Sequence, residues 1–208
     1  MTTFAVTTPA PIPQPSLRRQ KGYSIVELSI ALAIISIILV TALAGVQRIL
    51  RSNNTNEDLR NLNLLASKLT VMLTNVTNTA GINQGQLINL RMFEGFRVNA
   101  VAGTVNNAFG GTITVATNTA ALGTVPVNGG LMIYSGSIPP EVCSDYITGL
   151  NAISSHISAT NVANPAVAGA AYNSVVKSNV QPITIPNLAA ACTAAAGQTI
   201  TVAALIGS

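Results

Sequence analysis

The stretch YSIVELSIALAIISIILVTALAGVQRIL, residues 23–50, decides the fold. Its central nineteen residues, Leu28 to Val46, contain no charged residue and no proline. Because a helix rises 1.5 Å per residue, this run would span roughly 29 Å, close to the thickness of the hydrocarbon core of a bilayer. The sequence therefore predicts a membrane-length helix near the N-terminus.

The residues before this helix are of a different kind. Residues 1–17 contain four prolines and no charged side chain, so we expect them to be extended. Arg18, Arg19 and Lys21 follow, and should stay on the cytoplasmic side of a membrane, which leaves the C-terminal bulk of the chain outside. A conventional secretory signal peptide fits poorly, because the apolar run is too long and no small-residue cleavage site follows it directly.

Glu27 is the one acidic residue in the apolar segment. A carboxylate near hydrocarbon is costly and calls for a partner. The alternative is an interfacial glutamate whose side chain simply reaches the lipid headgroups. The residues alone leave both interpretations open.

The stretch RRQKGYSIVELSIALAIISIILVTAL, residues 18–43, resembles the prepilin signature of type IV pilins and their relatives. That signature combines a basic leader, a glycine, a hydrophobic first mature residue, a glutamate five positions into the mature chain and a long apolar run. Lys21, Gly22, Tyr23 and Glu27 match it position by position. The leader of twenty-two residues and a first mature residue other than Phe are more similar to the type IVb subclass.

This resemblance implies that residues 1–22 are a leader peptide. A membrane prepilin peptidase would cleave between Gly22 and Tyr23 and methylate the new amino group of Tyr23. The resemblance also implies a role for Glu27 in assembly, in which its carboxylate pairs with the Tyr23 amine of an adjacent subunit and fixes the subunit register. Desolvated charges are tolerated when paired and strongly destabilising when one partner is deleted.

The helix is predicted to continue beyond the membrane-length run. Apolar residues recur there at three- and four-residue spacing, in Leu59, Leu62, Leu65, Ala66, Leu69, Met72, Leu73 and Val76. This pattern indicates one helix over residues 23–76, of which residues 23–47 form the transmembrane and polymerisation half. We expect it to be loosened at Gly45 and in the polar residues 52–56.

Polar residues of this second half are expected on the other faces of the helix. Asn61 should lie away from the apolar stripe, and Glu57 and Asp58 should form a solvated patch. The apolar stripe itself needs a partner, which we expect to be the remainder of the chain.

Residues 77–208 are predicted to form a globular head. Residues 77–86 are typical of a loop. Short β-type runs separated by turn residues follow at 112–116, 131–134, 183–185 and 199–205. The fold class is therefore α+β, with a long N-terminal α-helix packed on an antiparallel β-sheet.

A second helix is predicted over residues 139–158, with Ser137 as its cap and two prolines near its first turn. Its apolar face would consist of Val142, Tyr146 or Ile147, Leu150, Ile153 and Ile157. His156 would lie near the end of this helix, in a surface or capping role.

Cys143 and Cys192 are the two cysteines of the chain. In an exported protein an even count suggests a disulfide, and two free thiols in the core are the alternative. A bridge closing about fifty residues would stabilise the fold by roughly 4 kcal/mol in a chain-entropy model. A first cysteine on a helix, with its partner near the C-terminus, resembles the disulfide-bounded region of type IVb pilins.

Composition argues against several other functions. Only 8% of the residues are charged, and beyond residue 22 seven basic and six acidic side chains nearly balance. Nucleic-acid binding lacks the concentrated basic face that it needs. The sequence has no cysteine and histidine cluster with metal-ligand spacing and no phosphate-binding glycine loop. We therefore predict no cofactor, no metal and no enzymatic activity.

The sequence favours a structural subunit of a type IV pilus. Its partners would be other pilin subunits, the prepilin peptidase, the pilus assembly machinery and, before assembly, the inner membrane. The chain would then move to an extracellular pilus. A minor pilin or a type II secretion pseudopilin is one alternative, and a signal-anchored periplasmic binding domain is another.

Overall fold

The computed structural model describes residues 24–76, 78–122, 124–160, 174–178, 181–194 and 198–207. The predicted cleavage site at Gly22 and Tyr23 lies outside these residues. The chain divides between Gly45 and Val46 into two units. Helix α1, Ile25–Leu73, contributes residues to both of them.

Helix α1 is uninterrupted through Gly45 and through residues 52–56, so the predicted loosening at both places is wrong. One glycine costs only about 1 kcal/mol in a helix, which cannot break one of this length. The polar side chains do not compete with the helix backbone. Thr55 Oγ1 donates to the Arg51 carbonyl one turn earlier, at 2.9 Å, and Asn54 Nδ2 donates outside the helix, to the Ala108 carbonyl at 3.3 Å.

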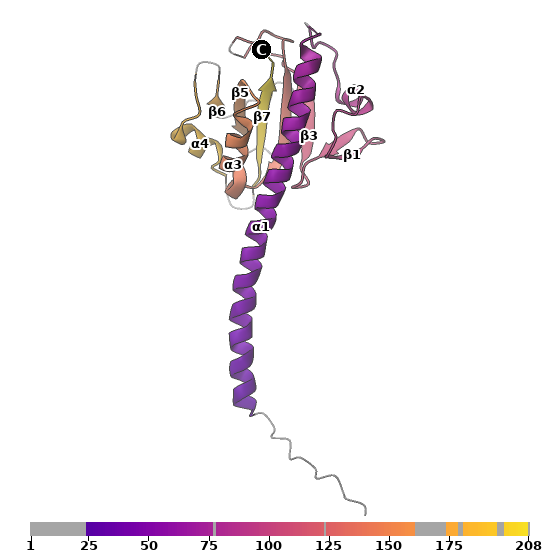
Figure 1. The fold of residues 1–208 in the computed structure, drawn as a ribbon. Helices are drawn as coiled ribbons and strands as arrows, with labels where there is room; N and C mark the ends of the chain where they lie inside the picture. Colours follow the sequence, from indigo (N-terminus) through magenta and orange to yellow (C-terminus); the bar gives the residue numbers. More distant parts are fainter. Residues whose placement is uncertain are drawn as a thin grey trace, which may run out of the picture. The chain divides into compact units, whose positions relative to one another are not determined.

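The second unit is built on one antiparallel sheet, whose strand order within the described residues is β1-β2-β3-β4-β7-β5-β6 (Figure 1). The strands are β1 Arg97–Asn99, β2 Thr104–Asn106, β3 Thr112–Thr117, β4 Leu131–Ile138, β5 His156–Thr160, β6 Ser174–Lys177 and β7 Ile200–Ile206. The shorter helices are α2 Gln84–Asn89, α3 Pro140–Leu150 and α4 Ile185–Ala191.

Alternation along the central strands gives the sheet two faces. On β4, Leu131 and Ile133 belong to the main hydrophobic core, whereas Met132 and Tyr134 belong to a smaller cluster. The neighbouring strand β7 alternates in the same way. The smaller cluster is completed by Val125, with Leu122 and Ala116 packed against it.

The main core receives α1 and α3 on the same face of the sheet (Figure 1). The α1 stripe of Leu62, Leu65 and Leu69 is at most 1% exposed. Tyr146 and Ile147 of α3 are fully buried in the same core. Burying each such side chain stabilises the fold by about 1.5–3 kcal/mol relative to leaving it exposed. Because the helix stripe and the sheet share one core, the predicted packing of the long helix on an antiparallel sheet is confirmed.

Two short segments differ from the sequence predictions. Residues 183–185 are not a strand, because Thr184 caps α4 by accepting from the Asn187 N–H at 3.4 Å. The predicted loop over residues 77–86 gives way to α2. There Asn83 and Gln86 form a capping box, in which each side chain accepts from the other residue's N–H at 3.0 Å.

The second predicted helix is shorter than expected. It ends at Leu150, and its N-cap is Pro139 rather than Ser137, which lies in β4. Lys177 Nζ donates to the carbonyls of Asn151 and Ser154, at 2.7 Å each, and so holds the turn that follows the helix. The chain then returns to the sheet as β5.

Gly111 provides a test of this packing. A Cβ atom at Gly111 would collide with the backbone carbonyl of Gly136 on β4, whereas at Gly85, in α2, the nearest atom would be at an ordinary 3.4 Å. We expect Gly111→Ala to lower the free energy of unfolding by about 1–3 kcal/mol through overpacking. Gly85→Ala should not lower it. Denaturant unfolding measures both, and equal stability of the two variants would contradict this packing.

Candidate functional site

The first candidate site is the surface of α1 from Ile25 to Leu50. Its large apolar side chains are all at least half exposed, and an 18-residue window reaches a mean hydropathy of 2.6. Among the described residues this is the one helix that is long and apolar enough to span a membrane. Such a surface requires cover from lipid or from other protein.

The hydroxyl groups of this segment are satisfied within the helix. Ser29 Oγ donates to the Val26 carbonyl at 2.8 Å, and Ser36 Oγ to the Leu32 carbonyl at 2.7 Å. Thr41 Oγ1 bonds in the same way. These side chains can therefore enter an apolar environment without leaving a hydrogen bond unmade.

Glu27 is the exception in this segment. It lies in the first turn of α1, where a carboxylate is favoured by the helix dipole, and its side chain is exposed. Its carboxylate forms no ion pair or hydrogen bond with the residues that the structure describes. A partner from outside the helix is needed when this segment is covered, and the assignment of that partner to Tyr23 remains a prediction.

The second candidate site is the disulfide-bounded region. Cys143 on α3 and Cys192, just after α4, are joined by a disulfide with their Cα atoms 5.6 Å apart. The bond encloses β5, β6 and α4, which pack at one end of the sheet (Figure 1). The alternative of two free thiols is wrong.

Two polar residues of α1 lie where the sequence analysis did not place them. Asp58, expected in a solvated patch, is 1% exposed, and Asn61, expected on another face, is 8% exposed. Asp58 Oδ1 accepts from the Ala108 N–H at 2.8 Å, and Asn61 Nδ2 donates to the Gly95 carbonyl at 3.0 Å. Both side chains therefore tie α1 to the segment between α1 and β4.

The spacing of the leucine stripe could have revealed one of these positions. Extending the pattern of Leu69, Leu65 and Leu62 backwards by alternating steps of three and four residues reaches Asp58 and then Thr55, and both are buried. A carboxylate at this position favours a solvated face, because acidic residues are seldom buried without a cation.

His156 also differs from its predicted position. It begins β5 rather than ending a helix, and it pairs with Leu205 of β7. Burial lowers the pKa of its imidazole, which favours the neutral form. Its Nδ1 atom has no hydrogen-bond partner among the described residues. No nucleophile or acidic group is bonded to it there, and the arrangement does not support catalysis.

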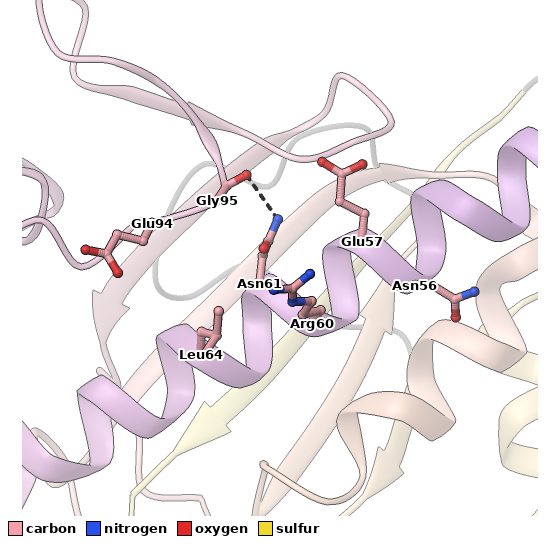
Figure 2. Close-up of a pocket in the computed structure, with 7 residues that line it drawn as sticks. All are labelled: Asn56, Glu57, Arg60, Asn61, Leu64, Glu94 and Gly95. Carbon is pink, nitrogen blue, oxygen red and sulfur yellow. Dashed lines mark hydrogen bonds between the residues drawn. The ribbon is translucent and has the colours of Figure 1, made fainter.

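An open groove of about 620 Å³ runs along α1 beside the loop that carries Glu94 (Figure 2). Figure 2 shows Asn61 reaching Gly95 across it, with Glu57 and Arg60 along the helix. Lys68 pairs with Glu94 at 2.7 Å, and its hydrogen bond lowers the pKa of that carboxyl. No cysteine or histidine lines the groove, and within the described ranges no cluster of potential metal ligands was found.

The fold is similar to two solved type IV pilin structures. The type IVb pilin of Salmonella typhi is 20% identical, with a TM-score of 0.50, over 73% of this chain and 98% of that one. TcpA, a type IV pilin of Vibrio cholerae El Tor biotype, is 17% identical, with a TM-score of 0.54, over 74% of this chain and 98% of that one. No curated protein sequence matches the chain.

Family models decide the identity. The prokaryotic N-terminal methylation motif matches residues 17–43, and the family described as PilS N terminal matches residues 52–205, roughly three quarters of the chain. The chain belongs to this PilS family of type IV pilins. Pilins of this family are structural subunits and not enzymes.

The disulfide of this pilin closes a loop with a sequence separation of 49 residues. Replacing both cysteines, Cys143→Ser with Cys192→Ser, should lower the free energy of unfolding by about 2–4 kcal/mol, because the unfolded chain gains conformational freedom. Denaturant unfolding checks this. A reductant should lower the wild-type midpoint by a similar amount and leave that of the double variant unchanged. A reduced wild type that keeps its midpoint would contradict the prediction.

Proposed function

We propose that this pilin is a precursor that is cut between Gly22 and Tyr23 and then polymerises through its N-terminal helix into a surface filament. Residues 1–22 would be the leader, residues 23–76 the helix and residues 77–208 the globular head. The observation that carries the proposal is the exposed apolar surface of residues 25–50, whose hydroxyl groups are satisfied internally and whose one carboxylate, Glu27, is not.

Cleavage would change the charge at the start of the helix. It would remove Arg18, Arg19 and Lys21 and create one new cation, the methylated amine of Tyr23. In a bundle of helices that excludes water, this amine on a neighbouring subunit would serve as the counter-charge for Glu27. A desolvated pair of this kind would fix the register of the subunits, while the apolar surface drives their association.

Before assembly, the helix would hold the subunit in the inner membrane. Its apolar run matches the thickness of a bilayer, and small residues at Ala31, Ala33, Ala42 and Ala44 would later let helices approach closely in the filament. The prepilin peptidase, the assembly machinery and other copies of the pilin would be its partners. The methylation-motif match includes Gly22, Tyr23 and Glu27, which argues against a simple signal-anchored binding domain.

The pairing of Glu27 can be tested in cells that assemble the filament. Glu27→Val should leave cleavage intact and abolish filaments, because the Tyr23 amine would then be buried without a counter-charge. Electron microscopy of surface material and the size of the membrane-bound chain give the two readouts. Glu57→Val is a matched control, since it removes an exposed carboxylate outside the apolar segment. Normal filaments of the Glu27 variant would disprove the pairing.

The cleavage site can be tested separately. We expect Gly22→Leu to block processing, because a large side chain at the last leader position would not fit the peptidase, and the chain should keep its leader and form no filaments. Gly22→Ala should still allow some cleavage. Electrophoretic mobility of the chain in membrane fractions distinguishes the two. Efficient cleavage of the Gly22→Leu chain at the same bond would contradict the assignment.

A further inference from the structure

Asp58 is an unusual component of the core of the second unit. Its carboxyl group is 1% exposed, on the face of α1 that continues the stripe of Leu62 and Leu65. Oδ1 accepts one hydrogen bond, from the Ala108 N–H at 2.8 Å. Oδ2 is buried and has no hydrogen-bond partner among the described residues. A carboxylate would normally use both oxygens, so half of its bonding capacity is unused in this position.

The groups around Asp58 come from three other elements. Tyr146 of α3 is fully buried, and its hydroxyl bonds to Ser135 Oγ of β4 at 2.8 Å. Ser135 Oγ also accepts from Asn107 Nδ2 at 3.1 Å, in the turn that joins β2 to β3. Burial raises the pKa of the Tyr146 phenol, and the nearby Asp58 carboxylate raises it further. These hydroxyl and amide groups are bonded to one another, and none of them forms a hydrogen bond with Asp58 Oδ2.

Among the described residues, the Ala108 backbone N–H is the one group found to favour a negative charge on Asp58. On α1 the charged neighbour is Glu57, which repels the Asp58 carboxylate. The titratable group of α3 that faces it is the neutral Tyr146. The turn over residues 107–111 contains Asn, Ala, Phe and two Gly and no charged residue, and β4 contributes Ser135. Arg51 lies about two turns before Asp58 on α1. It pairs instead with Glu141 on the surface, with its Nη1 atom 2.9 Å from a carboxylate oxygen.

A protonated Asp58 would suit this environment better than an ionised one. A neutral carboxyl group costs far less to bury than a carboxylate whose second oxygen has no partner. Burial, opposed by the Ala108 N–H and assisted by Glu57, raises the pKa of Asp58 from its usual 3.8 to about 6. The carboxyl therefore changes its charge within the range that extracellular fluids cover.

We propose that Asp58 is a protonation-dependent latch: its neutral carboxyl group is accommodated in the core, where it lets α1 pack against the turn over residues 107–111 and the rest of the second unit. Loss of the proton leaves a desolvated negative charge in the core and weakens that junction. The pilin head is thus more stable at mildly acidic pH than at neutral pH. This latch lies wholly in the second unit, and it does not depend on cleavage or polymerisation.

The sign and size of the effect follow from proton linkage. Because the pKa is higher in the folded state than in the unfolded chain, the contribution of Asp58 to stability is fully present below pH 3.8 and is lost as the pH rises towards 6 and above. Between pH 5 and pH 7.5, a pKa of about 6 in the folded state makes the unfolding equilibrium constant rise about tenfold through this one group.

The test compares the full-length pilin in detergent micelles with its Asp58→Asn variant, which cannot titrate and still offers a donor at the second position. Urea unfolding at pH 5 and pH 7.5 should show the wild-type constant rising about tenfold more than that of the variant. His156 titrates with the opposite sign, but it is present in both proteins and cancels. Glu57→Gln, which removes only an exposed neighbour, should keep most of the wild-type dependence.

A second measurement keeps the proposal testable where Asp58→Asn does not fold. The ¹³C chemical shift of the Asp58 carboxyl in the wild-type pilin should titrate with a midpoint near 6, against about 4 for an ordinary aspartate. Equal pH dependence of the wild type and the Asn variant would overturn the latch. A carboxyl midpoint near 4 would also overturn it.

Discussion

The packing of one leucine stripe on the sheet is the interaction on which the second unit depends. Leu62, Leu65 and Leu69 of α1 lie in the same core as the central strands β4 and β7. Those strands alternate between two faces, so the stripe fixes which residues point inward. Without this packing the sheet would expose the apolar side of its two longest strands, and α1 would have no reason to continue beyond its membrane-length run.

The same helix meets a different requirement in its first part. Residues 25–45 are apolar on every side, so a single neighbouring surface cannot cover them. Lipid and a bundle of identical helices both can, and a subunit can exchange one for the other because its serine and threonine hydroxyls already bond within the helix. The Glu27 carboxylate has no such bond within the helix. It is therefore the one group on this apolar surface whose burial would depend on how neighbouring helices are aligned along their axes.

Much of this architecture could be predicted from residue patterns. The three- and four-residue spacing of apolar residues and the length of the apolar run identified α1. Runs of β-branched and apolar residues located most of β3 and β7 and the first half of β4. The short strands β1, β2 and β6 contain three or four residues each and leave no comparable signal. Asp58 and His156 were misplaced for another reason. The leucine spacing reaches position 58, but the partner that makes a buried carboxyl tolerable there, the Ala108 N–H, is brought to it only by tertiary structure, and the pairing of His156 with β7 is likewise tertiary.

The pairing of Glu27 in the filament depends on which residue begins the assembled chain. Mass spectrometry of the pilin from fibres sheared off the cell surface measures this directly. The account predicts a chain that begins at N-methylated Tyr23, with residues 1–22 absent. Fibres built from the intact chain, with its leader and all three of its basic residues still attached, would contradict it.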